Sequence, residues 1–198
     1  MSERPWPPAP LQWPAEPLSD GLVTLDRVTT GDVAAIVAAC NDPEAVRWLP
    51  LPVPYGDHDA SEFLAAQRPE ADRGVTLNFA IRRVGSPQLV GSIGAHFARA
   101  RADEAELGYW VAPAARGAGV ARRAIVLLAR HVFRTYEPRR IELLIQPGNV
   151  ASRRAATAAG AIFEGVRRAA IDLRGEPRDA AVYALLPADL AVNGEPRR

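Results

Sequence analysis

The stretch from Glu106 to Ala121, ELGYWVAPAARGAGVA, constrains the fold more than any other part of this 198-residue chain. Residues 109–111 are Tyr-Trp-Val, a combination that favours a β-strand. Pro113 then ends the strand, because proline has no N–H group to donate to a neighbouring strand. A turn with two glycines follows, and an amphipathic run begins behind it. The stretch therefore predicts a strand, a break and a glycine-rich turn that opens a helix.

The turn at residues 116–121 has the features of an anion-binding site. The first turn of a helix carries backbone N–H groups without partners in the helix, and the helix dipole adds partial positive charge there. Gly117 and Gly119 would let a ligand approach the backbone closely, because they carry no Cβ atom. Arg116 adds a guanidinium with forked donors. Together these features predict a site for a phosphate or pyrophosphate.

Two common nucleotide-binding loops do not fit this turn. A Walker A loop requires Gly-Lys-Ser/Thr after the glycines, and the chain contains no lysine. A dinucleotide-binding loop requires a third glycine where Arg122 stands, and an acidic residue after the next strand, where Gln146-Pro147 follows residues 141–145. An ordinary strand-to-helix turn and a pyrophosphate loop of the pattern Arg-x-x-Gly-x-Ala remain as alternatives.

Composition narrows the class of protein. A chain of this length, with 48% hydrophobic and 24% charged residues, is typical of one soluble globular domain with a sizeable core. A net charge of +1 gives no indication of nucleic-acid binding, and the single cysteine, Cys40, excludes an internal disulfide and a cysteine-rich metal site. No signal peptide or membrane-spanning apolar run is recognisable. We therefore expect a cytoplasmic enzyme with no metal and no membrane partner.

The hydrophobic patterns predict an α/β domain over residues 20–187. A proline-rich arm with Trp6 and Trp13 precedes it at residues 1–19, and residues 188–198 form a peripheral tail. A turn or short helix is expected after Asn41. The other predicted elements are strands at 22–25, 76–82, 88–97, 106–111, 141–145, 161–173 and 179–186, and helices at 33–40, 59–67, 118–134 and 149–159.

Several segments, taken in order, resemble the GNAT family of acyl-CoA N-acyltransferases, and within it the RimJ/RimL-type ribosomal-protein N-terminal acetyltransferases. The similarity covers about residues 20–187. Its pieces are Leu25-Asp26-Arg27, Asn41-Asp42-Pro43, Arg47-Trp48-Leu49, Gly91-Ser92-Ile93-Gly94, the 106–111 strand, Arg116-Gly117-Ala118-Gly119, and Asn149 with Ser152. The resemblance implies the GNAT fold, a mixed and mostly antiparallel central sheet that is splayed in the middle and flanked by helices.

The resemblance also implies an activity. GNAT enzymes transfer an acyl group, by default from acetyl-CoA, directly to a primary amine in a ternary complex without an acyl-enzyme. The acceptor here would be a protein N-terminal amine or a small amine, and a homodimer is compatible with the family. A non-catalytic acyl-CoA-binding module on the same fold is the alternative. Many family members carry a tyrosine as general acid seven residues after the asparagine, whereas this chain has Ala156.

The predicted donor site follows from the turn and from the resemblance. The pyrophosphate would bind the N–H groups of Arg116, Gly117, Ala118, Gly119, Val120 and Ala121. The backbone N–H near Val111 would hold the acyl carbonyl. By resemblance, Asn149 would bind the pantetheine arm, and Ser152 would replace the missing tyrosine near the CoA sulfur. The simpler interpretations are a helix N-cap for Asn149 and a solvated helix residue for Ser152.

The predicted acceptor site is built around a carboxylate. Glu106 is the candidate general base, acting through a water, because a carboxylate that loses hydration on an apolar strand holds a proton more tightly. A structural ion pair with an arginine is its alternative. Trp48, Tyr55 and His96 are the candidate acceptor contacts, although a tryptophan or a lone strand histidine is more often structural.

Overall fold

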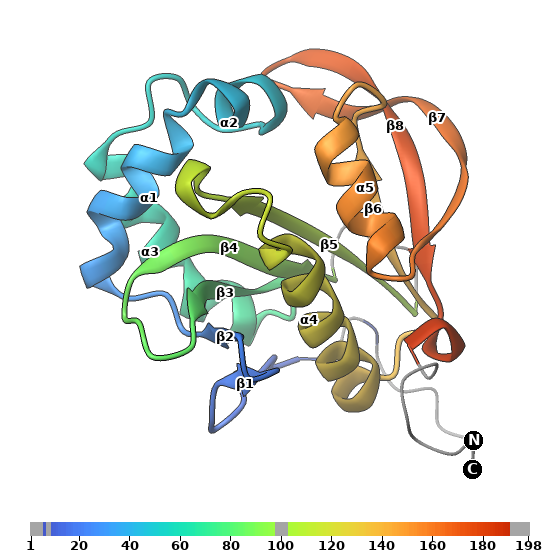
Figure 1. The fold of residues 1–198 in the computed structure, drawn as a ribbon, viewed down its shortest axis with the longest axis horizontal. Coiled ribbons are helices and arrows are strands. Elements are labelled where there is room, and N and C mark those ends of the chain that lie inside the picture. The colour runs from blue at the N-terminus through green and yellow to red at the C-terminus, as the bar shows by residue number, and fades with distance from the viewer. Residues whose placement is uncertain (1–5, 7–8, 98–102, 191–198) are drawn as a thin grey trace.

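The computed structural model describes residue 6, residues 9–97 and residues 103–190. Its centre is an eight-stranded sheet with the strand order β1-β2-β3-β4-β5-β6-β8-β7 (Figure 1). All neighbouring strands pair antiparallel except β5 and β6, which are parallel. The strands are β1 (Leu18–Ser19), β2 (Val23–Asp26), β3 (Thr76–Arg83), β4 (Leu89–His96), β5 (Glu104–Val111), β6 (Arg140–Ile145), β7 (Ile162–Leu173) and β8 (Glu176–Leu185).

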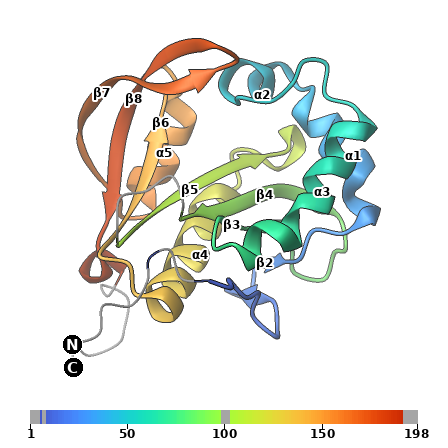
Figure 2. The ribbon, with the colours of Figure 1, turned by 180° about the vertical axis from the view of Figure 1, so that it is seen from behind.

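Helices cover the sheet unequally on its two faces. In Figure 1, α4 and α5 lie in front of the sheet, whereas Figure 2, seen from the opposite side, shows α3, with α1 beside it, over the β2–β4 half. The helices are α1 (Val33–Cys40), α2 (Pro43–Trp48), α3 (Asp57–Asp72), α4 (Val120–Tyr136) and α5 (Val150–Ala158), with short 3₁₀ turns at Thr30–Asp32, Pro113–Ala115 and Pro187–Leu190. The back of the β6–β8 half is the face without a helix over it in Figure 2.

The sheet is splayed between β5 and β6. These strands pair only from Glu104, opposite Arg140, to Glu106, opposite Glu142. Beyond that point β5 continues to pair with β4 up to Val111, and β6 continues with β8 (Figure 1). The two halves of the sheet therefore separate at the middle, which confirms the predicted fold class.

Two apolar clusters hold the layers together. The larger lies between the sheet and α4, whose buried face includes Val120, Ala124, Leu128 and Val132, one residue per turn of the helix. The smaller lies behind the sheet and joins Ile36 of α1 to Ala80, Leu89 and Tyr55 among other residues. The sheet is therefore packed on both faces, with α4 on one and α1 on the other.

The proline-rich segment packs against this domain. Leu11 is 1% exposed and its N–H donates to Ala71 O at 2.8 Å, while Trp13 Nε1 donates to Asn78 O at 2.9 Å. Leu18–Ser19 then forms β1, a two-residue strand too short to predict from its pattern. Residues 1–5, 7–8 and 191–198 of the predicted arm and tail lie outside the described residues.

The predicted elements are present, with differences at their ends. Helix α4 begins at Val120 rather than at 118, because Gly117 and Gly119 adopt φ angles of +75° and +73°, outside the helical range. Strand β5 begins at Glu104 rather than at 106, where its parallel pairing with β6 starts. Helix α3 continues through Pro69, which costs one backbone hydrogen bond, to Asp72.

Gly91 supports the close approach of β4 and β5, beside a register irregularity with β3. A Cβ atom at this position would lie 2.5 Å from the backbone oxygen of Trp110. We expect Gly91→Ala to lower the free energy of unfolding by about 1–3 kcal/mol, because the backbone must move to relieve the contact. Urea denaturation would measure this.

Gly31→Ala is the matched control for Gly91→Ala. Its Cβ would meet only Thr29 Oγ1, at an ordinary 3.6 Å. It should change the stability by less than about 0.5 kcal/mol. Equal effects of the two changes would show that the approach of β4 to β5 is not tight.

Candidate active site

Two cavities meet where β5 and β6 separate. The loop cavity, about 530 Å³, lies between the 115–122 turn, α2 and α5. The central cavity, about 690 Å³, is bounded by α1, the 48–51 segment, the ends of β4–β6 and residues 170–172. The side chains and backbone that line both are Trp48, Leu49, Tyr109, Trp110, Asn149 and Ser152.

The loop cavity contains the predicted N–H array. In the described part of the chain, no carbonyl or side chain accepts a hydrogen bond from the N–H groups of Gly117 to Ala121. The left-handed φ angles of Gly117 and Gly119 shape this turn at the start of α4. Of the predicted residues in the turn, all line the cavity except Ala118, which lies between the two glycines. The array can therefore bind an anion.

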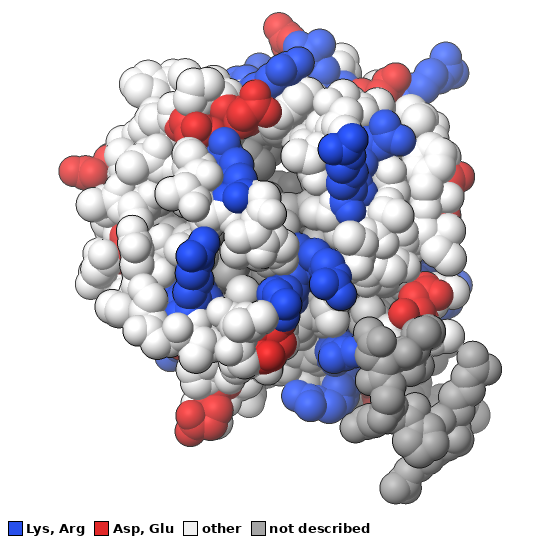
Figure 3. Space-filling view, in the orientation of Figure 1, with Lys and Arg blue, Asp and Glu red and all other residues white. Residues whose placement is uncertain are grey.

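Arg116 is held within the protein. Its Nη2 donates to Asp42 Oδ2 at 2.6 Å, its Nε donates to Val111 O at 3.0 Å, and its backbone N–H donates to Pro113 O. The N–H array thus begins at Gly117, and the Arg116 guanidinium joins the turn to α2. Arg122 and Arg154 also line the cavity. Figure 3 shows basic side chains around a hollow on this face of the molecule.

The backbone of Val111 points into the gap. Ala112 N donates to Val90 O on β4 at 2.9 Å. Because successive residues of a strand direct their N–H and C=O groups to opposite sides, those of Tyr109 and Val111 point away from β4, toward β6. The Val111 N–H is therefore placed to hold a ligand that enters between the strands.

Asn149 and Ser152 lie at the start of α5. Asn149 Oδ1 accepts a hydrogen bond from Ser152 N at 3.1 Å, so this residue is the N-cap, while no described residue accepts from its Nδ2. The Ser152 hydroxyl lies 2.8 Å from the hydroxyl of Tyr109. Both helix residues line the two cavities at their junction.

The central cavity brings together the predicted acceptor residues. Glu106 and His96 are directly opposite each other on β5 and β4, and both line this cavity together with Trp48 and Tyr55. His96 Nδ1 lies 3.1 Å from Thr76 Oγ1. Burial, with smaller contributions from nearby Cys40 and Asp59, raises the pKa of Tyr55 to about 12, so its phenol is neutral at physiological pH.

A third, charged cavity adjoins the central one. It has a volume of about 620 Å³, lies over β5, β6, β8 and β7, and shares Glu106, Leu144 and Arg167 with the central cavity. Its charges are mutually paired: Arg140 contacts Glu142 at 3.0 Å and also Glu164 at 2.5 Å. Glu104, the first residue of β5, also lines this cavity and pairs with Arg139 at 3.0 Å.

Comparison with known proteins identifies the family. The acetyltransferase (GNAT) domain model matches residues 23–162. The chain belongs to the GNAT acetyltransferase family. Membership confirms the resemblance stated above and makes this chain a transferase.

Similar GNAT proteins include an uncharacterised N-acetyltransferase, YoaA, of Bacillus subtilis, 27% identical over 164 residues, or 82% of this chain and 92% of the relative. Mycobacterium smegmatis RimJ, solved with CoA-disulfide, is 27% identical with a TM-score of 0.76, covering 89% of this chain and 88% of its own. RimL, the ribosomal L7/L12 alpha-N-protein acetyltransferase solved with coenzyme A, has the same fold at 19% identity and a TM-score of 0.73, covering 86% of this chain and 98% of its own.

The described residues include neither a metal-binding cluster nor a membrane-spanning helix. Among them, no group of three His, Cys, Asp or Glu side chains is arranged to hold a metal ion. None of the described helices combines the length and apolar character needed to cross a bilayer.

The sequence reasoning missed Tyr109 and Trp110 as members of this GNAT site. Both line the two cavities at their junction. Strand alternation could have indicated Tyr109, because it lies two residues before Val111 and so on the same side of the strand. The reasoning also missed Asp42, since nothing in the local sequence relates it to Arg116, 74 positions away.

Proposed function

We propose that this GNAT protein transfers the acetyl group of acetyl-CoA to a single primary amine, and that the acceptor is the N-terminal amine of a polypeptide. The observation that carries this proposal is the meeting of the loop and central cavities at Tyr109, Asn149 and Ser152. An acyl donor in one cavity and an amine in the other would reach each other only at this junction. That arrangement suits direct transfer in a ternary complex.

The loop cavity fits the donor. CoA carries a pyrophosphate and a further phosphate, and the N–H groups of residues 117–121 supply the donors that a pyrophosphate requires. Arg122 and Arg154 lie around the same cavity and add positive charge. RimJ from Mycobacterium smegmatis, with the same fold, was solved with a CoA derivative. These features support acetyl-CoA as the co-substrate.

Direct attack is also supported by the state of the only cysteine. Cys40 lines the central cavity, but burial raises its pKa to about 12, so the thiolate that a covalent acyl-enzyme would need is scarce. In the proposed reaction the amine attacks the thioester carbonyl while the Val111 N–H stabilises the developing oxyanion. Glu106, through a water, accepts the proton that the amine loses.

The acceptor cavity favours one amine on a largely uncharged body. Apolar residues such as Ile36, Phe63 and Leu143 form much of the lining, and Glu106 and Asp172 are its carboxylates. A polyamine or aminoglycoside would leave several cationic groups without partners. The adjoining charged cavity gives room for residues behind the reacting terminus. A polypeptide therefore fits the combined space better than a small amine.

The test is free-thiol release from acetyl-CoA with peptides that have free N-termini and with small amines. Turnover with peptides, abolished by blocking their N-terminal amine, would support the proposal. Turnover with small amines alone would overturn the acceptor class but keep the transferase. Binding of acetyl-CoA without turnover on any amine would favour a non-catalytic CoA-binding module. Absence of binding would overturn the assignment of the loop cavity.

Gly119→Ala tests the pyrophosphate turn. Its left-handed φ of +73° is strained for alanine, so the turn must shift and the N–H groups lose their alignment. We expect the Kd for CoA, measured by isothermal titration calorimetry, to rise about tenfold, which corresponds to about 1.4 kcal/mol.

Gly85→Ala is the matched control for Gly119→Ala. Its φ is +79° and, like Gly119, it has no atom within 4 Å of an added Cβ. It should cost a similar amount of stability without changing the affinity for CoA. A Gly119 variant that binds CoA normally would contradict the role of the turn.

A further inference from the structure

Collapse of the tetrahedral intermediate requires a proton for the departing thiolate. At the position where many relatives have an acidic tyrosine, this chain has Ala156, whose side chain is 0% exposed and carries no proton to donate. Ser152, one turn earlier on α5, lines the junction of the two cavities. An aliphatic hydroxyl alone is a far weaker acid than a phenol, so an unassisted Ser152 would be a poor proton donor.

Tyr109 supplies a phenol at this point. Its hydroxyl lies 2.8 Å from Ser152 Oγ and 3.2 Å from the Ser152 backbone oxygen. The phenol proton therefore has two acceptors that differ by a rotation about one bond. The ring comes from β5 and the serine from α5, so the contact joins the two sides of the gap in the sheet.

We propose that Tyr109 and Ser152 act as one proton-donating pair, in which the Ser152 hydroxyl protonates the CoA thiolate and Tyr109 orients that hydroxyl and returns its proton. This inference rests on the proposed function. Tyr109 is a positioning residue in this pair, since it acts through Ser152.

The proposed step balances its protons and electrons. The C–S bond breaks and its electron pair stays on sulfur. The sulfur takes the proton of Ser152 Oγ as that oxygen takes the proton of Tyr109 Oη. The resulting phenolate takes a proton from water in the central cavity, which Tyr109 also lines, and the hydroxide left behind is neutralised by the proton that Glu106 releases to the same water. The proton lost by the amine goes to Glu106 and from there to solvent.

The surroundings of Tyr109 keep its phenol protonated. Burial raises its pKa, and the hydrogen bond with Ser152 opposes this effect only in part. The phenol is therefore protonated throughout the physiological range. Glu106 lies three positions earlier on β5, so its side chain is on the opposite face of the strand. The acid and the base therefore approach the central cavity, which both line, from opposite faces of β5.

The first test compares Tyr109→Phe, Ser152→Ala and the double variant in the thiol-release assay. Each single change should lower kcat by about 10²-fold with little change in KM for acetyl-CoA, since the pair acts after binding. The double variant should be no slower than the slower single one, because both residues serve one proton path. Ser152→Thr should recover much of the activity.

A structural role for Tyr109 would give a different result. If its hydroxyl only ties β5 to α5, Tyr109→Phe should raise KM, lower the stability and add to Ser152→Ala, and this would overturn the inference. Tyr136→Phe is the matched control, because the hydroxyl of this half-buried tyrosine bonds only the backbone of Gln12 among the described residues. Fluorinated tyrosines at position 109, with graded phenol pKa values, should change kcat in proportion to their acidity.

A second readout needs no acceptor. Titration of the thiol of bound CoA, followed by the ultraviolet absorbance of its thiolate, should show a lower pKa in the wild type than in Tyr109→Phe or Ser152→Ala. Equal thiol pKa values in all three proteins would overturn the inference while the proposed function stands. Failure of the wild type to bind CoA would overturn both.

Discussion

Glu106→Gln is expected to lower kcat/KM by about 10²- to 10⁴-fold, the usual contribution of a general base. Glu106 lines the central cavity opposite His96 and lies just before the point where β5 leaves β6. The amide has nearly the same shape but cannot accept the proton that the attacking amine loses. Thiol release under saturating acetyl-CoA, with the acceptor varied, measures the effect.

Asp26→Asn is the control for Glu106→Gln. It makes the same loss of charge on β2, at the far side of the sheet, where the carboxylate accepts the N–H of Arg27. Its kcat/KM should stay within about threefold of the wild type. A Glu106 variant that retains more than about a tenth of the wild-type rate would show that the enzyme positions an already neutral amine and needs no base.

Asp32→Ala is expected to cause the largest loss of stability, about 3–5 kcal/mol. The Asp32 carboxylate accepts two hydrogen bonds of 2.8 Å from the Arg82 guanidinium, and the two side chains are 6% and 12% exposed. Thr29 adds hydrogen bonds from its N–H and hydroxyl. Removing the carboxylate leaves a buried guanidinium without its counter-ion. Urea unfolding at neutral pH measures the loss.

Two further variants test whether the loss of stability comes from the buried Asp32–Arg82 ion pair or from removing any aspartate charge. Asp20→Ala breaks an ion pair with Arg123 whose side chains are 25% and 32% exposed, and it should cost less than about 1 kcal/mol. Asp32→Ala combined with Arg82→Leu should recover part of the lost stability, because no unpaired charge remains buried. If Asp32→Ala lowers the free energy of unfolding as little as Asp20→Ala does, the burial of the Asp32–Arg82 pair does not contribute to stability.

The same pair gives a defined pH dependence. Burial by itself raises the pKa of Asp32, but the hydrogen bonds from Arg82 and Thr29 outweigh it, so the folded-state pKa is lowered. The stabilisation is therefore fully present above the unfolded-state pKa of about 3.9 and is lost as the pH falls through the lower folded-state value. The difference in unfolding free energy between wild type and Asp32→Ala should shrink over that acidic range.

The order of elements could be predicted because it follows from local patterns. The period of the apolar residues marks α4, and Gly160, with its φ of +97°, ends α5 as a glycine commonly does. The anion-binding turn was recognisable for the same reason, since its glycines, arginine and following helix are contiguous in the sequence.

The finer features of the site depend on tertiary contacts. Tyr109 meets Ser152 only because β5 and α5, 43 residues apart in the chain, border the same gap. The sequence predicts Arg116 as a forked donor to the pyrophosphate, whereas its guanidinium pairs in the structure with Asp42, the N-cap of α2. Hydrophobic periodicity carries no information about either pair.

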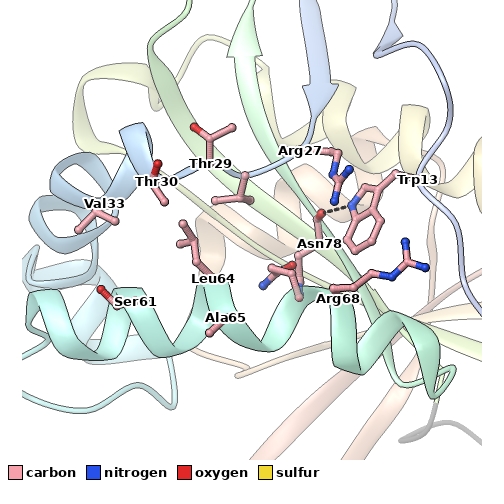
Figure 4. A pocket seen from close by; sticks show the side chains of 12 residues that line it. Trp13, Arg27, Thr29, Thr30, Val33, Ser61, Leu64, Ala65, Arg68 and Asn78 are labelled. Atoms are coloured by element: carbon pink, nitrogen blue, oxygen red, sulfur yellow. Dashed lines mark hydrogen bonds between the residues drawn. The ribbon is translucent and has the colours of Figure 1, made fainter.

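The separation of β5 from β6 leaves the protein with an unfinished sheet in its interior. The backbone N–H groups of Tyr109 and Val111 face a gap that a strand would normally fill, and an exposed strand edge is open to pairing with other chains. Here α4 and α5 flank the gap on the front face of the sheet (Figure 1), whereas the pocket beside Trp13 and Arg68 lies away from it, along α3 (Figure 4). An extended ligand with amide groups, such as the pantetheine arm of CoA, would form hydrogen bonds with these strand edges as a β-strand does. The central sheet would then be continuous across β5 and β6 only in the complex with the acyl donor.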